Sequence, residues 1–184
     1  MRMAGMTESE NLIIRRYNED DFEDFVRLQE EDPILRSFDE DIIRNSTRKV
    51  LEESSCERYS IFEKPSMQYC GNIEFHQDAA EEYPEIGITL LEEKQNQGIG
   101  TEAIVRFCND CVNVRGISTI IVRIEQENIR SKHLFEKLGA ECIGNRTLPI
   151  FEKIYREIGK PVPSNSDEIG AATYYLKLPI LNVK

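Results

Sequence analysis

The spacing of apolar residues along the chain alternates between the period of two that is typical of strands and the period of about 3.6 that is typical of helices. Strands are predicted over residues 11–17, 57–62, 68–75, 85–91, 118–125, 141–144 and 172–178. Helices are predicted over residues 20–30, 39–53, 101–115, 128–138 and 148–158. Between two of the strands, Lys64, Pro65 and Ser66 form a turn signal that indicates an antiparallel hairpin.

Length and charge restrict the classes of protein to which the chain can belong. Its 184 residues, 40% of them hydrophobic, suit one domain, which we expect over residues 11–184 after a flexible segment of residues 1–10. A formal charge of −11 would repel nucleic acid and attract cationic small molecules or basic peptide ends. No membrane span or signal peptide is recognisable, so we expect a cytoplasmic protein without membrane partners. The charge argues against nucleic-acid partners, and we expect a monomer or homodimer.

The five cysteines are expected to be reduced thiols, because their number is odd and no secretory signal accompanies them. Cys108 and Cys111 form a CxxC pattern, which could indicate a redox pair or half of a metal site. They fall inside an apolar helical repeat, however, and His76 and His133 are the only histidines. We interpret both thiols as core-facing and expect no metal.

The most informative segment is a glycine turn between a predicted strand and a predicted helix. It reads Gln95, Asn96, Gln97, Gly98, Ile99, Gly100 and Thr101. Glycines let a ligand approach the backbone closely, and the first amides of a helix lack partners within the helix and lie at the positive end of its dipole. The turn is therefore a candidate site for a pyrophosphate.

Two other interpretations of the turn stay open. Gly98, Gly100 and Ala103 also satisfy GxGxxA, the dinucleotide fingerprint of Rossmann folds, which would predict a nicotinamide-dependent oxidoreductase. In that fold the strand runs directly into the first glycine, whereas here residues 92–97 intervene and a hairpin precedes. The turn could also be structural and hold no ligand.

Two motifs in the second half of the chain resemble the GNAT superfamily of N-acetyltransferases. Gln95, Gly98 and Gly100 match the superfamily's acetyl-CoA-binding pattern Gln/Arg-x-x-Gly-x-Gly/Ala. Residues 128–139 resemble its N-x-x-S followed by F-E-K-L-G. Glu85, Ile86 and Gly87 are similar to a strand in the branch that includes the ribosomal-protein N-terminal acetyltransferases.

The resemblance implies an α+β, three-layer fold with a mixed, mostly antiparallel central sheet, splayed middle strands and flanking helices. It implies acetyl-CoA as acyl donor, no metal, and a primary amine as acceptor. The acceptor would be a peptide amino terminus or a small amine, and a cationic acceptor would suit the acidic chain. The residues implied in binding acetyl-CoA are Ile88, Thr89, Leu90, Gln95, Asn96, Gln97, Gly98, Ile99, Gly100, Thr101, Asn128 and Ser131.

The chemistry needs a base for the amine and a donor for the leaving thiolate. Glu85 is our candidate base, with Glu74 or water as alternatives, although Glu85 could be an ordinary surface carboxylate. A backbone amide among residues 88–90 would polarise the thioester carbonyl. Asn128 and Ser131 would face the sulfur and the pantetheine arm, and Asn128 could equally be a helix cap.

Three positions depart from the family pattern. Phe135 stands where many members have a tyrosine acid, which leaves Ser131 or solvent as proton donor. Ala140 replaces a usual aromatic residue, and residues 148–158 look like an insertion. A catalytically weak acyl-CoA-binding or regulatory module therefore stays open as an alternative function. We expect His133 to be a solvated helix residue.

Overall fold

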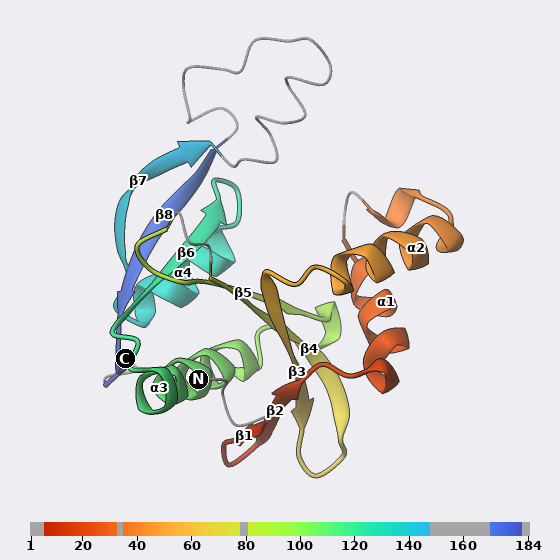
Figure 1. The fold of residues 1–184 in the computed structure, drawn as a ribbon, viewed down its shortest axis with the longest axis horizontal. Helices are drawn as coiled ribbons and strands as arrows, with labels where there is room; N and C mark the ends of the chain where they lie inside the picture. Colours follow the sequence, from red (N-terminus) through yellow and green to blue (C-terminus); the bar gives the residue numbers. More distant parts are fainter. Residues whose placement is uncertain (1–5, 33–34, 78–80, 148–169, 182–184) are drawn as a thin grey trace.

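The computed structural model describes residues 6–32, 35–77, 81–147 and 170–181, and arranges them around one mixed sheet (Figure 1). In the order in which they lie side by side, its strands are β1 (Met6–Glu8), β2 (Leu12–Arg16), β3 (Cys56–Glu63), β4 (Gln68–His76), β5 (Glu85–Leu90), β6 (Thr119–Glu125), β8 (Gly170–Lys177) and β7 (Glu141–Thr147). Neighbouring strands are antiparallel except for β5 and β6. The α+β class and the β3–β4 hairpin are thereby confirmed.

Helices cover both faces of this sheet (Figure 1). They are α1 (Phe22–Glu30), α2 (Glu40–Leu51), α3 (Ile99–Arg115) and α4 (Ile129–Lys137), with short 3-10 turns at η1 (Glu19–Asp21), η2 (Leu35–Ser37) and η3 (Glu92–Lys94). Ile14 and Ile61 belong to the same buried cluster as the apolar residues of α3 and α4, whereas Ile13 and Phe62 pack with Leu28 of α1. Because strand side chains alternate between faces, α3 and α4 lie opposite α1.

Aromatic packing fixes α3 against the strands. Phe107 is fully buried, and its ring lies 4.9 Å from that of Tyr59 and 6.1 Å from that of Phe75 between centroids. Cys108 and Cys111 are buried on the same side of α3, which confirms that both thiols face the core. The helix therefore has a fixed position relative to β3 and β4.

Strands β5 and β6 are paired only at their first contact and then diverge. One cross-strand pair, Glu85 with Ile121, joins them, and the amide of Ile121 donates to the carbonyl oxygen of Pro84 at 2.8 Å. Beyond this pair β6 continues beside β8 while β5 stays with β4. The splayed middle strands implied by the family resemblance are present.

Two differences from the sequence predictions concern the start of the chain and the start of α3. Strand β1 corrects the expectation of a flexible segment over residues 1–10 for residues 6–8 alone, which pair with β2 although they form no apolar run; residues 1–5 lie outside the described residues. Helix α3 begins at Ile99, two residues before its predicted start, since the glycine turn already has helical geometry there. The helix expected over residues 148–158 lies outside the described residues. No helix within the described ranges is both long and apolar enough to cross a membrane.

Candidate active site

The entrance of α3 is open and built by a left-handed glycine. Gly98 is the N-cap, with φ 82° and ψ −11°, and its carbonyl oxygen accepts from the amide of Glu102 at 3.0 Å. No side chain caps this end, so the amides of Ile99, Gly100 and Thr101 have no acceptor within the helix. A Cβ added at Gly98 would meet no described atom within 4 Å, so the space beside this residue is open among the described residues.

A cavity of ≈ 580 Å³ lies between this entrance, β5 and the start of α4. Ten of the residues expected to bind acetyl-CoA line it: Ile88, Thr89, Leu90, Gln95, Asn96, Gly98, Gly100, Thr101, Asn128 and Ser131. The cavity is narrow at Gly100, where an added Cβ would lie 3.5 Å from Leu90 Cδ1 and 3.8 Å from Leu134 Cδ2. A larger residue there would fill the passage between β5 and α4.

Two other residues of the predicted set do not line the cavity. The side chain of Gln97 turns back, and its Nε2 donates to the carbonyl oxygen of Glu93 at 2.6 Å. Ile99 is buried in the main core. The side chains of Gln97 and Ile99 therefore do not line this cavity, and a role for these two residues in cofactor binding stays a prediction.

Gln95 connects the end of β5 to the glycine turn. Its Nε2 donates to the carbonyl oxygen of Leu90 at 2.9 Å. The amide of Leu91 donates to the carbonyl oxygen of Cys70 on β4. Successive amides of a strand point alternately to its two sides, so the amides of Ile88 and Leu90 point away from β4 and toward β6. Because β6 has diverged there, these amides face the opening between the strands.

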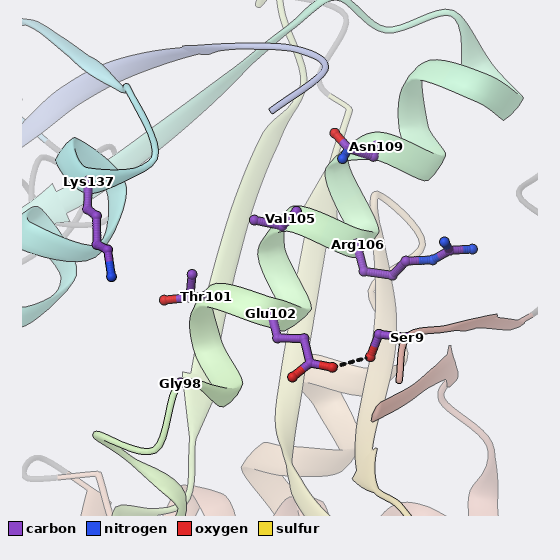
Figure 2. Close-up of a pocket in the computed structure, with 8 residues that line it drawn as sticks. All are labelled: Ser9, Gly98, Thr101, Glu102, Val105, Arg106, Asn109 and Lys137. Atoms are coloured by element: carbon purple, nitrogen blue, oxygen red, sulfur yellow. Dashed lines mark hydrogen bonds between the residues drawn. The ribbon is translucent and has the colours of Figure 1, made fainter. Parts of the chain in front are cut away.

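A second hollow of ≈ 530 Å³ lies on the outer side of the α3 entrance (Figure 2). It shares Gly98, Thr101 and Lys137 with the first cavity, so the two meet at the helix start. Its floor is held by Glu102, which accepts from Ser9 Oγ at 2.5 Å and from the amide of Asn11 at 3.2 Å. Lys137 reaches from α4 toward the side of α3 that carries Thr101, as Figure 2 shows.

The start of α4 forms the opposite wall. Asn128 is its N-cap, and Oδ1 accepts from the amide of Ser131 at 3.0 Å, which confirms the capping interpretation while leaving Asn128 on the cavity wall. His133 is exposed, as predicted, and also lies at the cavity rim with Arg130. Phe135 is only 1% exposed and belongs to the core. This position therefore offers no route to the cavity for a side chain of similar length.

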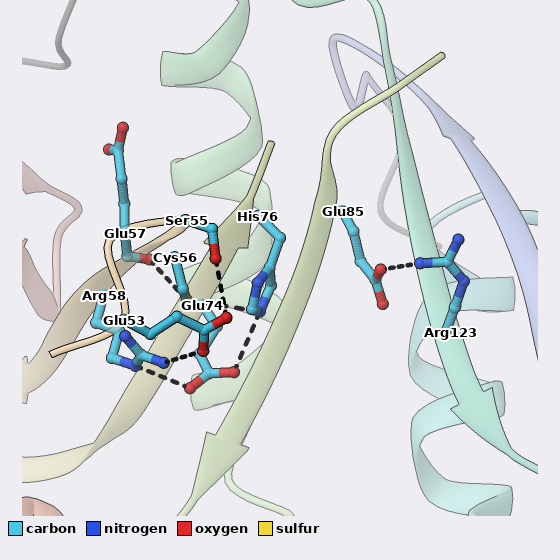
Figure 3. A network of polar contacts seen from close by, with 9 residues as sticks. All are labelled: Glu53, Ser55, Cys56, Glu57, Arg58, Glu74, His76, Glu85 and Arg123. Carbon is cyan, nitrogen blue, oxygen red and sulfur yellow. Dashed lines mark hydrogen bonds and ion pairs between the residues drawn. The ribbon is translucent and has the colours of Figure 1, made fainter. Parts of the chain in front are cut away.

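Glu85 lies at the vertex of the two splayed strands and does not line the cavity. Its carboxylate is paired with Arg123 of β6 (Figure 3). The same guanidinium also binds Glu81. Burial raises the pKa of Glu85, and the charge of Arg123 opposes that rise without cancelling it. The vertex thus carries two carboxylates around one guanidinium.

Glu74 lies on β4, next to β5, and on the same face of the sheet as Glu85. Its Oε1 accepts from Arg58 Nε at 3.2 Å, and its Oε2 lies 3.4 Å from His76 Nε2 (Figure 3). Burial would raise the pKa of Glu74, but His76 and Arg58 together lower it. Cys56, His76 and Glu85 are successive cross-strand neighbours in one row of the sheet.

Comparisons with known proteins point to one family. A family model described as "Acetyltransferase (GNAT) domain" matches residues 11–141. An acetyltransferase (GNAT family) from Bacillus anthracis is similar in structure, with a TM-score of 0.66 and 21% identity over 92% of this chain and 95% of that one. The spermidine N-acetyltransferase from Vibrio cholerae in complex with CoA and spermine gives a TM-score of 0.67 and 15% identity over 92% and 96%. No curated protein matches the chain.

Proposed function

The chain belongs to the GNAT acetyltransferase family, and on that premise we propose that it transfers an acetyl group from acetyl-CoA to a primary amine. The open entrance of α3 beside the splayed strands is the observation that carries this function. Residues 11–184 act as one acyltransferase domain.

The pyrophosphate of acetyl-CoA binds to the free amides at the start of α3. These amides lie at the positive end of the helix dipole, and anions are stabilised there without a lysine in the turn. Arg130 and Lys137 line the same cavity and supply positive charge for the phosphates in a chain that is otherwise acidic. Gly98 and Gly100 leave room for this approach.

The pantetheine arm continues between β5 and the start of α4. Ile88 and Leu90 offer an apolar wall on the β5 side, and Asn128, Ser131 and Leu134 line the opposite, α4 side. The thioester carbonyl then accepts from an amide among residues 88–90 that faces the opening. This places the reacting carbon near the vertex, where Glu85 lies.

The reaction is a direct transfer. The neutral amine attacks the thioester carbon, and the C–N bond forms while the C–S bond breaks. Glu85 accepts the proton that the amine loses, through a water molecule, and the CoA thiolate is protonated by Ser131 or by solvent. Burial of Glu85 favours this role because a raised pKa makes a carboxylate a better base.

The acceptor reaches the vertex from the face that carries α1. Glu74, Glu81 and Glu85 are all partly exposed carboxylates on or beside that face, and they suit an acceptor that carries further positive charge. Two acceptor classes fit this charge: a peptide amino terminus, which the resemblance of residues 85–87 favours, and a polyamine, which the spermine bound to the similar Vibrio cholerae enzyme favours.

The test is release of CoA thiol by the full chain with acetyl-CoA and a panel of amines, including spermine and a short basic peptide. Acetylated product with stoichiometric CoA release supports the proposed function. Acetyl-CoA binding without release from any amine would instead favour the regulatory module, for which the burial of Phe135 is the motivating observation.

A further inference from the structure

Three potential metal-binding atoms converge on the α1 face of the sheet, beside the vertex (Figure 3). They are Sγ of Cys56 at the start of β3, and Oε2 of Glu74 and Nε2 of His76 at the end of β4. Nε2 of His76 lies 3.5 Å from the sulfur and 3.4 Å from the carboxylate oxygen, and all three atoms lie within 4.8 Å of one another.

Weak polar contacts already join these groups: Cys56 Sγ lies 3.7 Å from the carbonyl oxygen of Glu57, and a protonated His76 would form an ion pair with Glu74. One imidazole nitrogen carries at most one hydrogen, so Nε2 of His76 cannot donate to Cys56 and Glu74 at the same time. The distance of 3.4 Å to the oxygen is also longer than the usual range of about 2.7–3.2 Å for such bonds.

A tetrahedral cation would satisfy the three groups at once. Bond lengths of about 2.0–2.1 Å from zinc to nitrogen or oxygen and about 2.3 Å to sulfur place the ligand atoms about 3.3–3.4 Å apart for N···O and about 3.5–3.6 Å apart for N···S. The observed separations are 3.4 Å and 3.5 Å. Two of the three separations therefore match a shared tetrahedral ion, and the third, between Cys56 Sγ and Glu74 Oε2, is below 4.8 Å.

The surroundings supply what such a site needs beyond its ligands. Arg58 is buried and donates to the other carboxylate oxygen of Glu74, a contact that orients a ligating carboxylate. When a divalent cation binds, Cys56 would lose its proton, and the Cys56 thiolate and the Glu74 carboxylate together would balance the two positive charges of the ion. The side chains of Glu74 and His76 are 32% and 36% exposed, which leaves solvent access for entry and for a water as fourth ligand.

We infer that Cys56, Glu74 and His76 form a binding site for a zinc-class divalent cation. Thiolate and imidazole ligands select zinc over magnesium or calcium, which prefer oxygen. Because His76 pairs across the ladder with Glu85, the ion lies on the face from which the acceptor approaches. It ties the start of β3 to the end of β4 and does not depend on acetyl-CoA.

Metal binding is measured on the full chain by equilibrium dialysis with Zn²⁺ and by the absorption spectrum after Co²⁺ is bound in its place. We expect about one ion per chain and a cobalt spectrum with a thiolate charge-transfer band and tetrahedral ligand-field bands. Cys56→Ser and His76→Gln should each weaken binding at least about tenfold. Cys142→Ser and His133→Gln remove an exposed cysteine and an exposed histidine, and should bind as the wild type does.

A second readout needs no variant. Zn²⁺ should slow alkylation of Cys56 in the wild-type chain at least about tenfold while exposed Cys142 reacts at an unchanged rate, measured by peptide mass spectrometry. No ion bound, retention of binding in Cys56→Ser, or equal alkylation of Cys56 with and without zinc would each overturn the site.

Discussion

Glu85 of β5 is paired with Arg123 of β6 at the one place where these two strands are joined. The pair spans the vertex from which the strands diverge, and Glu81 binds the same guanidinium from the preceding loop. The position of a half-buried carboxylate is fixed by such a partner. The candidate base is therefore held in place before any substrate binds.

Replacing Glu85 separates its proposed catalytic role from its pairing role. Glu85→Gln keeps the shape but removes the base, so kcat should fall about 100-fold while the KM for acetyl-CoA stays unchanged. Glu81→Gln is the matched control, because it also removes a carboxylate from Arg123 but should retain turnover. Equal losses in both variants, or full activity of Glu85→Gln, would assign the proton transfer elsewhere.

Asn128 is both a helix cap and part of the cavity wall, and two variants distinguish these contributions. Asn128→Ala should lower stability by about 1 kcal/mol and weaken acetyl-CoA binding, whereas Asn128→Ser retains a capping oxygen and should restore most of the stability. We expect acetyl-CoA affinity to stay weak in Asn128→Ser, measured by calorimetry. Full recovery of affinity with the serine would limit Asn128 to capping.

Glu102 should contribute stability that depends on pH. Burial alone would raise its pKa, but hydrogen bonds from Ser9 and Asn11 outweigh it and lower the pKa below 4.5. A carboxylate whose pKa is lower in the folded state stabilises the fold above its unfolded pKa, and this contribution is lost as the pH falls through the folded value.

The Tm of Glu102→Gln should therefore lie below that of the wild type at neutral pH, and the difference should shrink below about pH 4.5. Exposed Glu10, replaced by glutamine, serves as the control and should show no such difference. A Tm difference that is constant across pH would contradict the role of the Glu102 hydrogen bonds.

Phe135→Tyr should not restore a proton donor. The ring is buried among core residues, so an added hydroxyl lacks room to reach the cavity and loses its contact with water. We expect a loss of about 1–3 kcal/mol in stability, seen as a lower Tm, without a gain in kcat. A faster variant would show instead that this side chain reaches the reacting atoms.

The glycine turn was predictable because it depends on local geometry. Gly98 and Gly100 adjoin a helix start in the sequence itself, and the amides they expose belong to the same segment. Capping by Asn128 is local in the same sense. Ile99 was included in the cofactor set from the motif alone, and its burial depends on packing against the sheet.

Contacts between distant strands were not predictable in the same way. Arg123 reaches Glu85 only because β5 and β6 meet at residues 85 and 121, and Cys56 meets His76 only through the register of the β3–β4 hairpin. A shift of one residue would turn each side chain to the other face. Strand β1 was missed because its three residues contain no apolar run and pair with β2 by backbone bonds.

Calorimetric titration of two glycine variants with acetyl-CoA tests whether the α3 entrance binds the pyrophosphate. Gly98 and Gly116 both have left-handed backbones, at the N-cap and the C-cap of the same helix, so Gly98→Glu and Gly116→Glu carry similar backbone strain and the same added charge. Only Gly98 faces the cavity. We predict that Gly98→Glu weakens acetyl-CoA binding at least about 100-fold and that Gly116→Glu binds as the wild type does. Unchanged affinity in Gly98→Glu, or equal weakening in both variants, would show that the pyrophosphate binds elsewhere.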